Sequence, residues 1–345
     1  MWNPNTYRDA DFGLEEGETF EPEFDPTEES EAPIDQPHIM TLLGPILPEE
    51  LGVCLPHVHL LCDPPGADDD HRLLDTERAE AEVEAFITMN GRSLVECTTR
   101  DCGRMTSDLL SIAQWVPAHL IGVTGRKNHS SAALLPYALD RDALFEEFLA
   151  DLTEGMDGTD ARAGVIKVGT SLNEITDIER VTIQAAGAAH ARTGAPITTH
   201  TEHGTEALQL LELLEASGVE ANRVIIGHVD REQMPLDAHL DVVRTGAYLQ
   251  FDQIGKSETY TDQQRADRIA ELYEAGYGDR LLLSLDYGRK SLLSAYDGAP
   301  GLPYMSEWFM VLLMESGLQA MQIRQLAIEN PARALTIHPP RDQGA

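Results

Sequence analysis

Short apolar strands alternate with amphipathic helical stretches through most of the chain, from about residue 39 onward. Eight segments have the length and composition of buried strands, and helical periodicity appears between and after them. The strands are predicted at 53–59, 93–97, 120–124, 164–169, 195–200, 224–228, 248–252 and 281–286, and the helices at 76–90, 142–154, 178–193, 204–217, 234–244, 262–276, 304–316 and 316–335. This alternation predicts an α/β fold, a parallel (β/α)₈ TIM barrel. No G-x-G-x-x-G motif follows a strand, which argues against a dinucleotide-binding sheet.

The first 38 residues lack this pattern. They are rich in aspartate, glutamate and proline, carry a single basic residue, Arg8, and show no apolar periodicity. Such a composition buries too little apolar surface to fold by itself. We therefore expect a disordered acidic tail over residues 1–38, followed by one barrel domain over residues 39–340.

The net charge is −34 and the sequence pI is about 4.5, with 25 lysines and arginines against 59 aspartates and glutamates. This charge repels nucleic acids and anionic membranes, so neither is a predicted partner. An acidic, lysine-poor composition resembles that of proteins from salt-loving organisms, in which salt screens the self-repulsion. No apolar run reaches membrane-spanning length and no signal peptide precedes the barrel, which predicts a soluble, cytoplasmic protein.

One of only four lysines, Lys167, stands inside the apolar run 164–169. An ammonium group in a buried strand must be desolvated, paired, neutralised or chemically modified. Its side chain either reaches solvent or a carboxylate from the strand end, or it serves as a functional amine. The residues at the ends of the other strands decide between these interpretations.

Metal-binding residue types stand at the ends of several predicted strands. The first strand ends on His57 and His59, whose side chains point to the same side. In a barrel the carboxyl ends of the strands meet at one mouth, so these groups should converge there with Lys167, His200, His228 and Asp286. Imidazoles and a carboxylate suit zinc and similar divalent ions. Two adjacent metals need a bridging anion, which a neutral lysine becomes when it adds carbon dioxide to form a carbamate.

The sequence resembles the phosphotriesterase family of the amidohydrolase superfamily. The resemblance rests on the order of the H-x-H pair, the buried lysine, the two later histidines and the final aspartate. The resemblance extends over about residues 41–334 and includes the segments 51–59, 95–104, 162–167, 193–201, 226–230, 251–256, 284–286 and 330–333. It implies two divalent metal ions, zinc being expected and manganese, cobalt or iron being alternatives. It also implies that His57, His59 and Asp286 hold the buried metal, His200 and His228 the more exposed one, and carbamylated Lys167 bridges both.

The sequence departs from the family pattern at several positions. Val58 replaces the usual acidic residue between the first two histidines, and Glu96 stands where an aspartate is common, which we expect to alter packing beneath the site. Basic residues replace the usual aromatic residue after the third strand, and others follow the eighth. The predicted substrate contacts are Arg126, Lys127, Tyr287 and Lys290.

The resemblance implies a metal-dependent hydrolase in which a metal-bridging hydroxide attacks the substrate. Asp286 and Lys167 are the expected catalytic residues, with Asp286 accepting a proton. The expected substrate is a small molecule, a polar lactone such as a sugar lactone, because basic residues near the mouth favour polar or anionic groups. Phosphotriesters, other carboxylic esters and amides are alternative substrates, and a silent barrel used for binding is an alternative of another class. The sequence leaves open whether the protein forms a homodimer.

Overall fold

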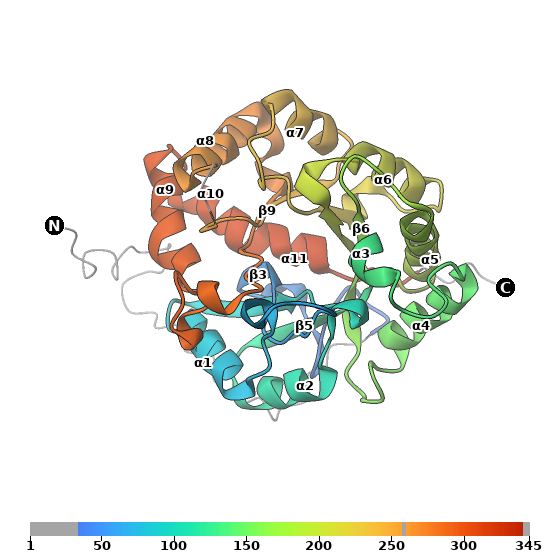
Figure 1. Ribbon diagram of the computed structural model, residues 1–345. Helices are drawn as coiled ribbons and strands as arrows, with labels where there is room; N and C mark the ends of the chain where they lie inside the picture. The colour runs from blue at the N-terminus through green and yellow to red at the C-terminus, as the bar shows by residue number, and fades with distance from the viewer. Residues whose placement is uncertain (1–33, 257–259, 341–345) are drawn as a thin grey trace.

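Eight parallel strands form the centre of the molecule. The computed structural model describes residues 34–256 and 260–340. The strand order is that of the sequence, and Figure 1 shows helices surrounding the strands. The strands are β3 (Val53–Val58), β4 (Gly91–Glu96), β5 (His119–Gly125), β6 (Ala163–Thr170), β7 (Ile197–Thr201), β8 (Val224–Ile226), β9 (Tyr248–Phe251) and β10 (Leu281–Leu283). All eight strands were predicted, and the (β/α)₈ fold is confirmed.

The seam between β3 and β10 closes the barrel. The backbone N–H of Asp286 donates to the carbonyl oxygen of His57 at 2.9 Å, and the N–H of His57 donates to Ser284 Oγ at 2.8 Å. The Ser284 hydroxyl donates in turn to the His57 carbonyl at 2.7 Å. The first and last strands are therefore joined by hydrogen bonds that involve two of the predicted site residues.

Helices follow most strands and cover the outside of the barrel. Most match the predicted segments, but α2 and the four-residue α3 were missed, and the predicted helix 316–335 is broken into α10, a π-helical turn and α11. No side-chain cap begins α2, so its start gives no local signal. The helices are α1 (Thr76–Ile87), α2 (Thr106–Trp115), α3 (His129–Ala132), α4 (Arg141–Thr153), α5 (Asp177–Thr193), α6 (Ala207–Glu215), α7 (Leu236–Val243), α8 (Asp262–Leu272), α9 (Met310–Glu315), α10 (Ala320–Arg324) and α11 (Asn330–Leu335).

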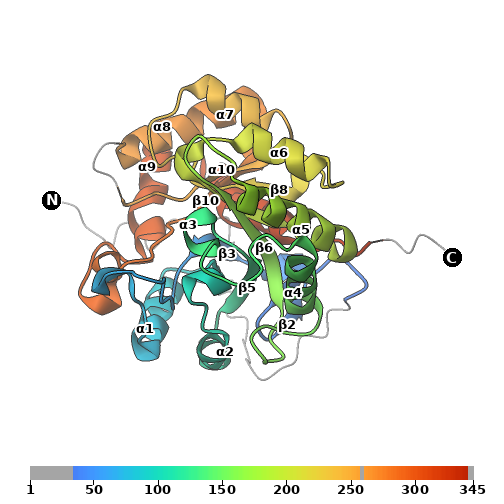
Figure 2. The same ribbon diagram turned by 45° about the vertical axis from the view of Figure 1, so that its right-hand side comes forward.

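A hairpin that the sequence analysis missed, β1 (Ile39–Thr41) with β2 (Gly44–Ile46), closes the N-terminal end of the barrel. Its apolar side chains join those of α11 in a core inside the strands. A β-carbon at Gly164 would lie 2.3 Å from the carbonyl oxygen of Met40, so only glycine lets β1 pass so close to β6. Figure 2 shows β2 at the end of the barrel away from α3.

The predicted acidic tail lies almost wholly outside the described residues, which begin at residue 34. The four cysteines, Cys54, Cys62, Cys97 and Cys102, are free and buried. Among the described residues, no helix is both long and apolar enough to cross a membrane.

His239 is a buried neutral histidine on α7. It is 1% exposed, it contacts the Val229 carbonyl oxygen through Nε2, and burial lowers its pKa from 6.5 to about 4. The folded protein therefore binds fewer protons than the unfolded chain between these values, so stability is lost as the pH falls from 6.5 towards 4. We expect the wild-type protein to lose roughly 2 kcal/mol more than His239→Gln between about pH 7 and pH 5. Chemical unfolding measures this; equal losses would contradict it.

Candidate metal centre

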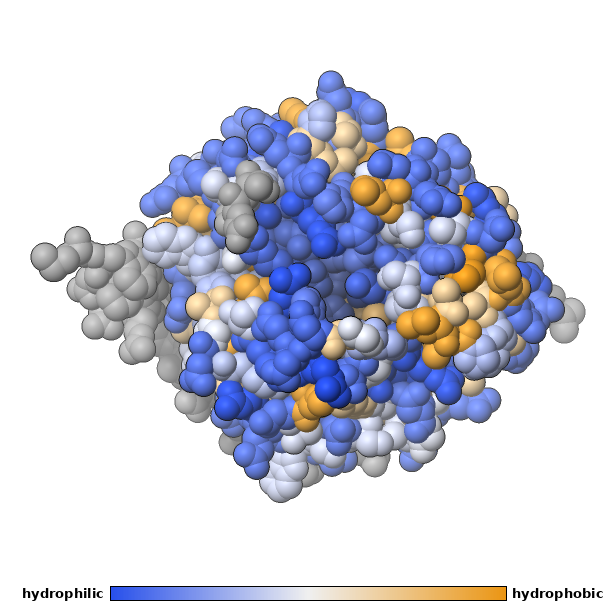
Figure 3. Space-filling view, viewed as in Figure 1, coloured by the Kyte–Doolittle hydropathy of each residue, from blue (hydrophilic) through white to orange (hydrophobic). Residues whose placement is uncertain are grey.

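The predicted site residues meet at the C-terminal ends of the strands. On this face of the molecule, hydrophilic residues line a hollow at the centre of the ring of helices (Figure 3). The strands do not carry all of these residues: β8 ends at Ile226 and β10 at Leu283, so His228 and Asp286 lie just beyond their strands. The mouth of the barrel is therefore polar, and the loops that follow the strands shape it.

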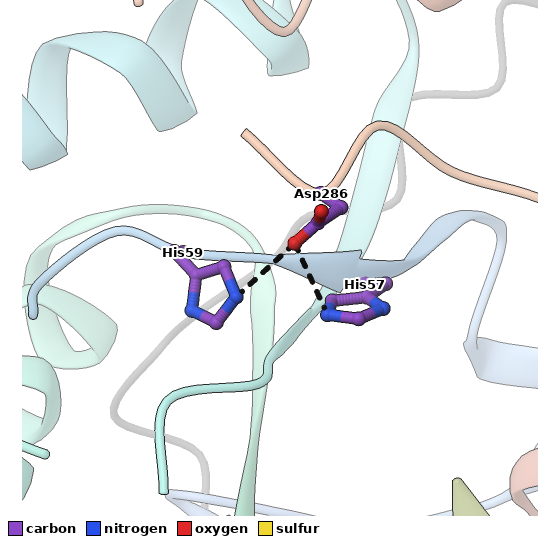
Figure 4. Close-up of side chains that lie close together, drawn as sticks. All are labelled: His57, His59 and Asp286. Carbon is purple, nitrogen blue, oxygen red and sulfur yellow. Dashed lines mark ion pairs between the residues drawn. The ribbon is translucent and has the colours of Figure 1, made fainter. Parts of the chain in front are cut away.

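His57 and His59 point at the same carboxylate oxygen, as Figure 4 shows. The Nε2 atoms of His57 and His59 lie 3.4 and 3.3 Å from Asp286 Oδ1. These three residues form a group that could hold a metal ion. The H-x-H pair at the end of β3 thus meets the aspartate that follows β10 across the barrel seam.

Asp252 orients two of the histidines. Its Oδ2 lies 3.0 Å from His57 Nδ1, and its Oδ1 lies 2.7 Å from His228 Nδ1. Burial opposes ionisation, but His228 and His57 hold the pKa of Asp252 well below its ordinary value. A carboxylate only accepts hydrogen bonds, so both Nδ1 atoms carry the protons. Asp252 therefore fixes the tautomer that leaves both Nε2 lone pairs free for a metal.

His200 and His228 form a second pair of nitrogens. His200 Nε2 lies 2.8 Å from Glu202 Oε2, so this nitrogen carries the proton, and His200 Nδ1 faces His228 Nε2 at 2.7 Å. Two lone pairs would then face each other at hydrogen-bond distance. A cation between them removes the repulsion, so the donor set fits a metal ion here.

Lys167, on β6, is 2% exposed and lies beside His57. Its Nζ donates to the Cys97 carbonyl oxygen at 2.9 Å and lies 3.2 Å from His57 Nε2. Within the described residues, no carboxylate forms an ion pair with it. A buried ammonium without a counter-charge is costly, so its chemical conversion to an anion beside metal ions would remove this cost. Neither an ion pair nor a solvent-exposed amine, the two structural alternatives, is observed.

Burial keeps the imidazoles of His57 and His59 neutral. It lowers the pKa of His57 to about 4 and that of His59 to about 3, from 6.5. Burial opposes the ionisation of Asp286 too, but nearby Lys256, His57 and His228 outweigh it and hold the pKa of Asp286 well below its ordinary value. At neutral pH the centre therefore presents neutral ring nitrogens and an ionised carboxylate, the forms that bind metals.

The backbone is strained at two of these positions. His228 has a φ of 59° and Asp286 a φ of 46°, in the left-handed region that residues with side chains rarely adopt. Each costs of order 1–3 kcal/mol, and such strain gathers at functional sites. At His228 the backbone N–H also donates to Asp252, which supports the strained turn.

The four predicted substrate contacts lie in different environments. Arg126 is 2% exposed and pairs with Glu147 through two 2.8 Å hydrogen bonds, which does not fit a substrate contact. Lys290 pairs with Asp69 at 2.9 Å, and Tyr287 is fully buried. Lys127 is half-buried, and its ammonium forms no ion pair with the described residues. Of the four, Lys127 keeps a free charge.

We expect Arg126→Met to lower stability and to leave substrate selectivity unchanged, because it breaks a buried ion pair. The loss should be about 3–5 kcal/mol in the free energy of unfolding. Glu147→Gln breaks the same pair from its other side and should have a similar effect. A selective loss of kcat/KM on anionic substrates without loss of stability would contradict this assignment.

Several residues of the centre were not assigned by the sequence analysis. Gln253 Nε2 and Lys256 Nζ donate to Asp286 Oδ2 at 2.9 and 2.6 Å. Lys256 also donates to the Asp286 carbonyl oxygen. Asp252 and Gln253 directly follow β9, the same position at which the other site residues stand. Strand-end position alone was thus a signal that could have found them.

A profile of the phosphotriesterase family matches residues 37–335. The chain belongs to the phosphotriesterase family. The family expected from the motifs is therefore confirmed, and the chain is a metal-dependent hydrolase.

Individual relatives agree with this assignment. The phosphotriesterase homology protein of Escherichia coli K12 is 34% identical over 287 residues, which cover 82% of this chain and 97% of that protein. The N-acetyltaurine hydrolase of Dictyostelium discoideum is 29% identical over 278 residues, which cover 77% of this chain and 75% of that protein. The crystal structure of a lactonase from Listeria monocytogenes has a TM-score of 0.83 at 30% identity, covering 87% of this chain and 99% of that one. The similar proteins thus include one named as a lactonase and one named as an N-acetyltaurine hydrolase.

Proposed function

We propose that this phosphotriesterase-family chain is a binuclear-metal lactonase acting on a polar lactone with a negatively charged group, such as an anionic sugar lactone. The observation that carries the two-metal centre is Lys167, buried beside His57 with no carboxylate partner among the described residues. Its carbamate would bridge two metal ions, with zinc expected. The Listeria lactonase supports the choice of substrate class.

His57, His59 and Asp286 would hold one metal ion, and His200 and His228 the other. When bound, the two ions would lower the pKa of water towards neutrality and polarise the carbonyl oxygen of the substrate. Asp286 would accept a proton from the attacking water while the water oxygen adds to the carbonyl carbon. The ester C–O bond then breaks, and the proton passes to the departing alkoxide, which gives a hydroxy acid. Hydrogen bonds from Gln253 and Lys256 to Asp286 Oδ2 keep this carboxylate in position.

A negative group on the substrate matches two cations beside the centre. Lys256 pairs with Asp286 on one side. The second cation, Lys127, follows β5. Burial is the main cause of the lowered pKa of His200, and the charge of Lys127 lowers it further. Lys127 is the better candidate for the substrate contact, because its ammonium forms no ion pair in the described part of the chain.

We expect Lys127→Ala to reduce kcat/KM on an anionic lactone and to leave a neutral lactone of the same ring nearly unchanged. A charge-assisted hydrogen bond contributes about 1–3 kcal/mol, so the selective loss should be roughly 5- to 150-fold. Lys290→Ala is the control, since Lys290 already pairs with Asp69. Equal losses on both lactones would overturn the role of Lys127.

Amide hydrolysis is the second candidate, because the relatives include N-acetyltaurine hydrolases. The experiment that separates the candidates is one screen of lactones, N-acyl amino-sulfonates, carboxylic esters and phosphotriesters with protein reconstituted with Zn²⁺, Mn²⁺ or Co²⁺. It should be run in molar potassium chloride and repeated at about 0.1 M, because we propose that the charge of −34 makes the fold depend on salt. A highest kcat/KM on an amide or a phosphotriester would refute the lactonase proposal.

A further inference from the structure

Among the described residues, no carboxylate contacts the ring nitrogen of His59 that faces away from the centre, unlike the other three predicted histidine ligands. Asp252 orients His57 and His228, and Glu202 orients His200. For His59 the corresponding nitrogen, Nδ1, lies 2.7 Å from the hydroxyl oxygen of Thr98. A hydroxyl can donate or accept, so this contact alone leaves the tautomer of His59 undetermined.

Glu96 determines the direction of this hydrogen bond. The Thr98 hydroxyl lies 2.6 Å from Glu96 Oε1. The backbone N–H groups of Leu60 and Thr98 also donate to this carboxylate, at 3.2 and 3.1 Å. A carboxylate that receives these donors accepts the hydroxyl proton of Thr98 as well. Since the hydroxyl has one proton, its oxygen must then accept the Nδ1–H of His59.

We propose that Glu96 and Thr98 are positioning residues that hold His59 in the Nδ1–H tautomer, so that Nε2 presents its lone pair to the metal ion. Glu96 ends β4 and pairs in register with Val58, the residue between the two histidines. Glu96 and Thr98 are fully buried beneath the site. The glutamate that departs from the family pattern therefore acts through Thr98 on His59. This inference concerns the metal centre, and it rests on the proposed role of His59 as a ligand but not on the choice of substrate.

The tautomer of His59 is measurable in metal-free protein. Nitrogen-15 NMR of histidine-labelled protein at about pH 8.5, above the pKa of about 7 to which burial raises Glu96, distinguishes the two ring nitrogens. Asp286 Oδ1 lies 3.3 Å from Nε2 and competes for the ring proton in metal-free protein, but the Nδ1 contact is shorter, at 2.7 Å. We therefore expect Nδ1–H at His59 in the wild-type protein and in Thr98→Ser, which keeps the hydroxyl. In Thr98→Val, which is similar in shape but lacks the hydroxyl, we expect the Nε2–H form to be populated.

Metal affinity gives a second readout, by equilibrium dialysis against Zn²⁺ buffered with a chelator. Loss of a residue that orients a ligand typically lowers metal affinity 10- to 100-fold. Thr98→Val should therefore weaken one of the two metal sites by about this factor. Thr98→Ser should restore the affinity. Thr99→Val is the matched control, because Thr99 is equally buried and its hydroxyl has no hydrogen-bond partner in the described structure.

Glu96→Gln tests the same arrangement if Thr98→Val does not fold. A glutamine amide can donate to the Thr98 hydroxyl, which would then donate to His59 Nδ1 and reverse the tautomer. The proposal is overturned if His59 keeps its Nδ1–H form in both variants, or if Thr98→Ser and Thr99→Val lose as much affinity as Thr98→Val. A lactonase screen that fails while the tautomer shifts as expected would refute the proposed substrate alone.

Discussion

Lys167→Ala should remove nearly all hydrolytic activity and reduce the metal content of the purified protein below two ions per chain. Removing a residue that only orients a ligand costs about 10- to 100-fold, so losing the bridging ligand itself should cost more. The substitution leaves space where the lysine side chain was buried, and a short carboxylic acid such as propionate could occupy it. Partial recovery of activity and of metal content with added propionate would identify the missing group as a carboxylate bridge. Elemental analysis and kcat/KM, both measured in molar salt, provide the test.

Lys290→Ala is the control for this experiment, because it removes a lysine that lies at the surface and pairs with Asp69. It should keep its metal ions and its activity. A Lys167→Ala protein that retains two metal ions and wild-type activity would eliminate the carbamate.

Asp252→Ala should weaken metal binding by roughly 10²- to 10⁴-fold, because one carboxylate orients two of the histidines. Each orienting partner contributes about 10- to 100-fold to affinity, and here two are lost together. Asp252→Asn should lie between this variant and the wild type, because an amide oxygen can still accept one Nδ1–H. Competition with a chelator measures the affinity.

Asp151→Asn separates this effect from the general cost of losing a buried carboxylate. Asp151 accepts hydrogen bonds from Arg104 and Thr124 and contacts none of the histidines. This variant should be less stable yet bind metal normally. Unchanged affinity in Asp252→Ala would show that packing alone orients His57 and His228.

The fold was predictable because each strand of a parallel barrel is buried on both faces and therefore reads as a short apolar run. Elements without such a signal were missed. The hairpin of β1 and β2 consists of two three-residue strands, too short for periodicity, and α2 begins without a capping side chain. The predicted helix 316–335 overlooked a local signal, because Pro331 at the start of α11 has no backbone N–H to continue the helix from the π-helical turn before it.

The candidate metal centre was predictable to the extent that its residues stand at the ends of strands. His57 and His200 are the last residues but one of their strands, and Lys167 lies near the end of β6. His59, His228 and Asp286 follow their strands within three residues. The partners of the metal-facing groups were harder to find, because a hydrogen bond such as that from His59 to Thr98 depends on the register of two strands. Arg126 shows the converse error: its charge suggested a substrate contact, whereas Glu147 on α4, 21 residues later in the chain, neutralises it.

Because the metal centre lies across the seam between β3 and β10, metal binding should affect how firmly the barrel is closed. His57 and Ser284, whose hydrogen bonds close the barrel, are 227 residues apart in the chain. His57 and Asp286 lie on opposite sides of this seam, so an ion held by both would cross-link the ends of the barrel, much as a disulfide bond closes a long loop. In metal-free protein, amide hydrogen exchange should therefore accelerate first along this seam. Removal of the ions would then expose the barrel to proteases at the line where its first and last strands meet.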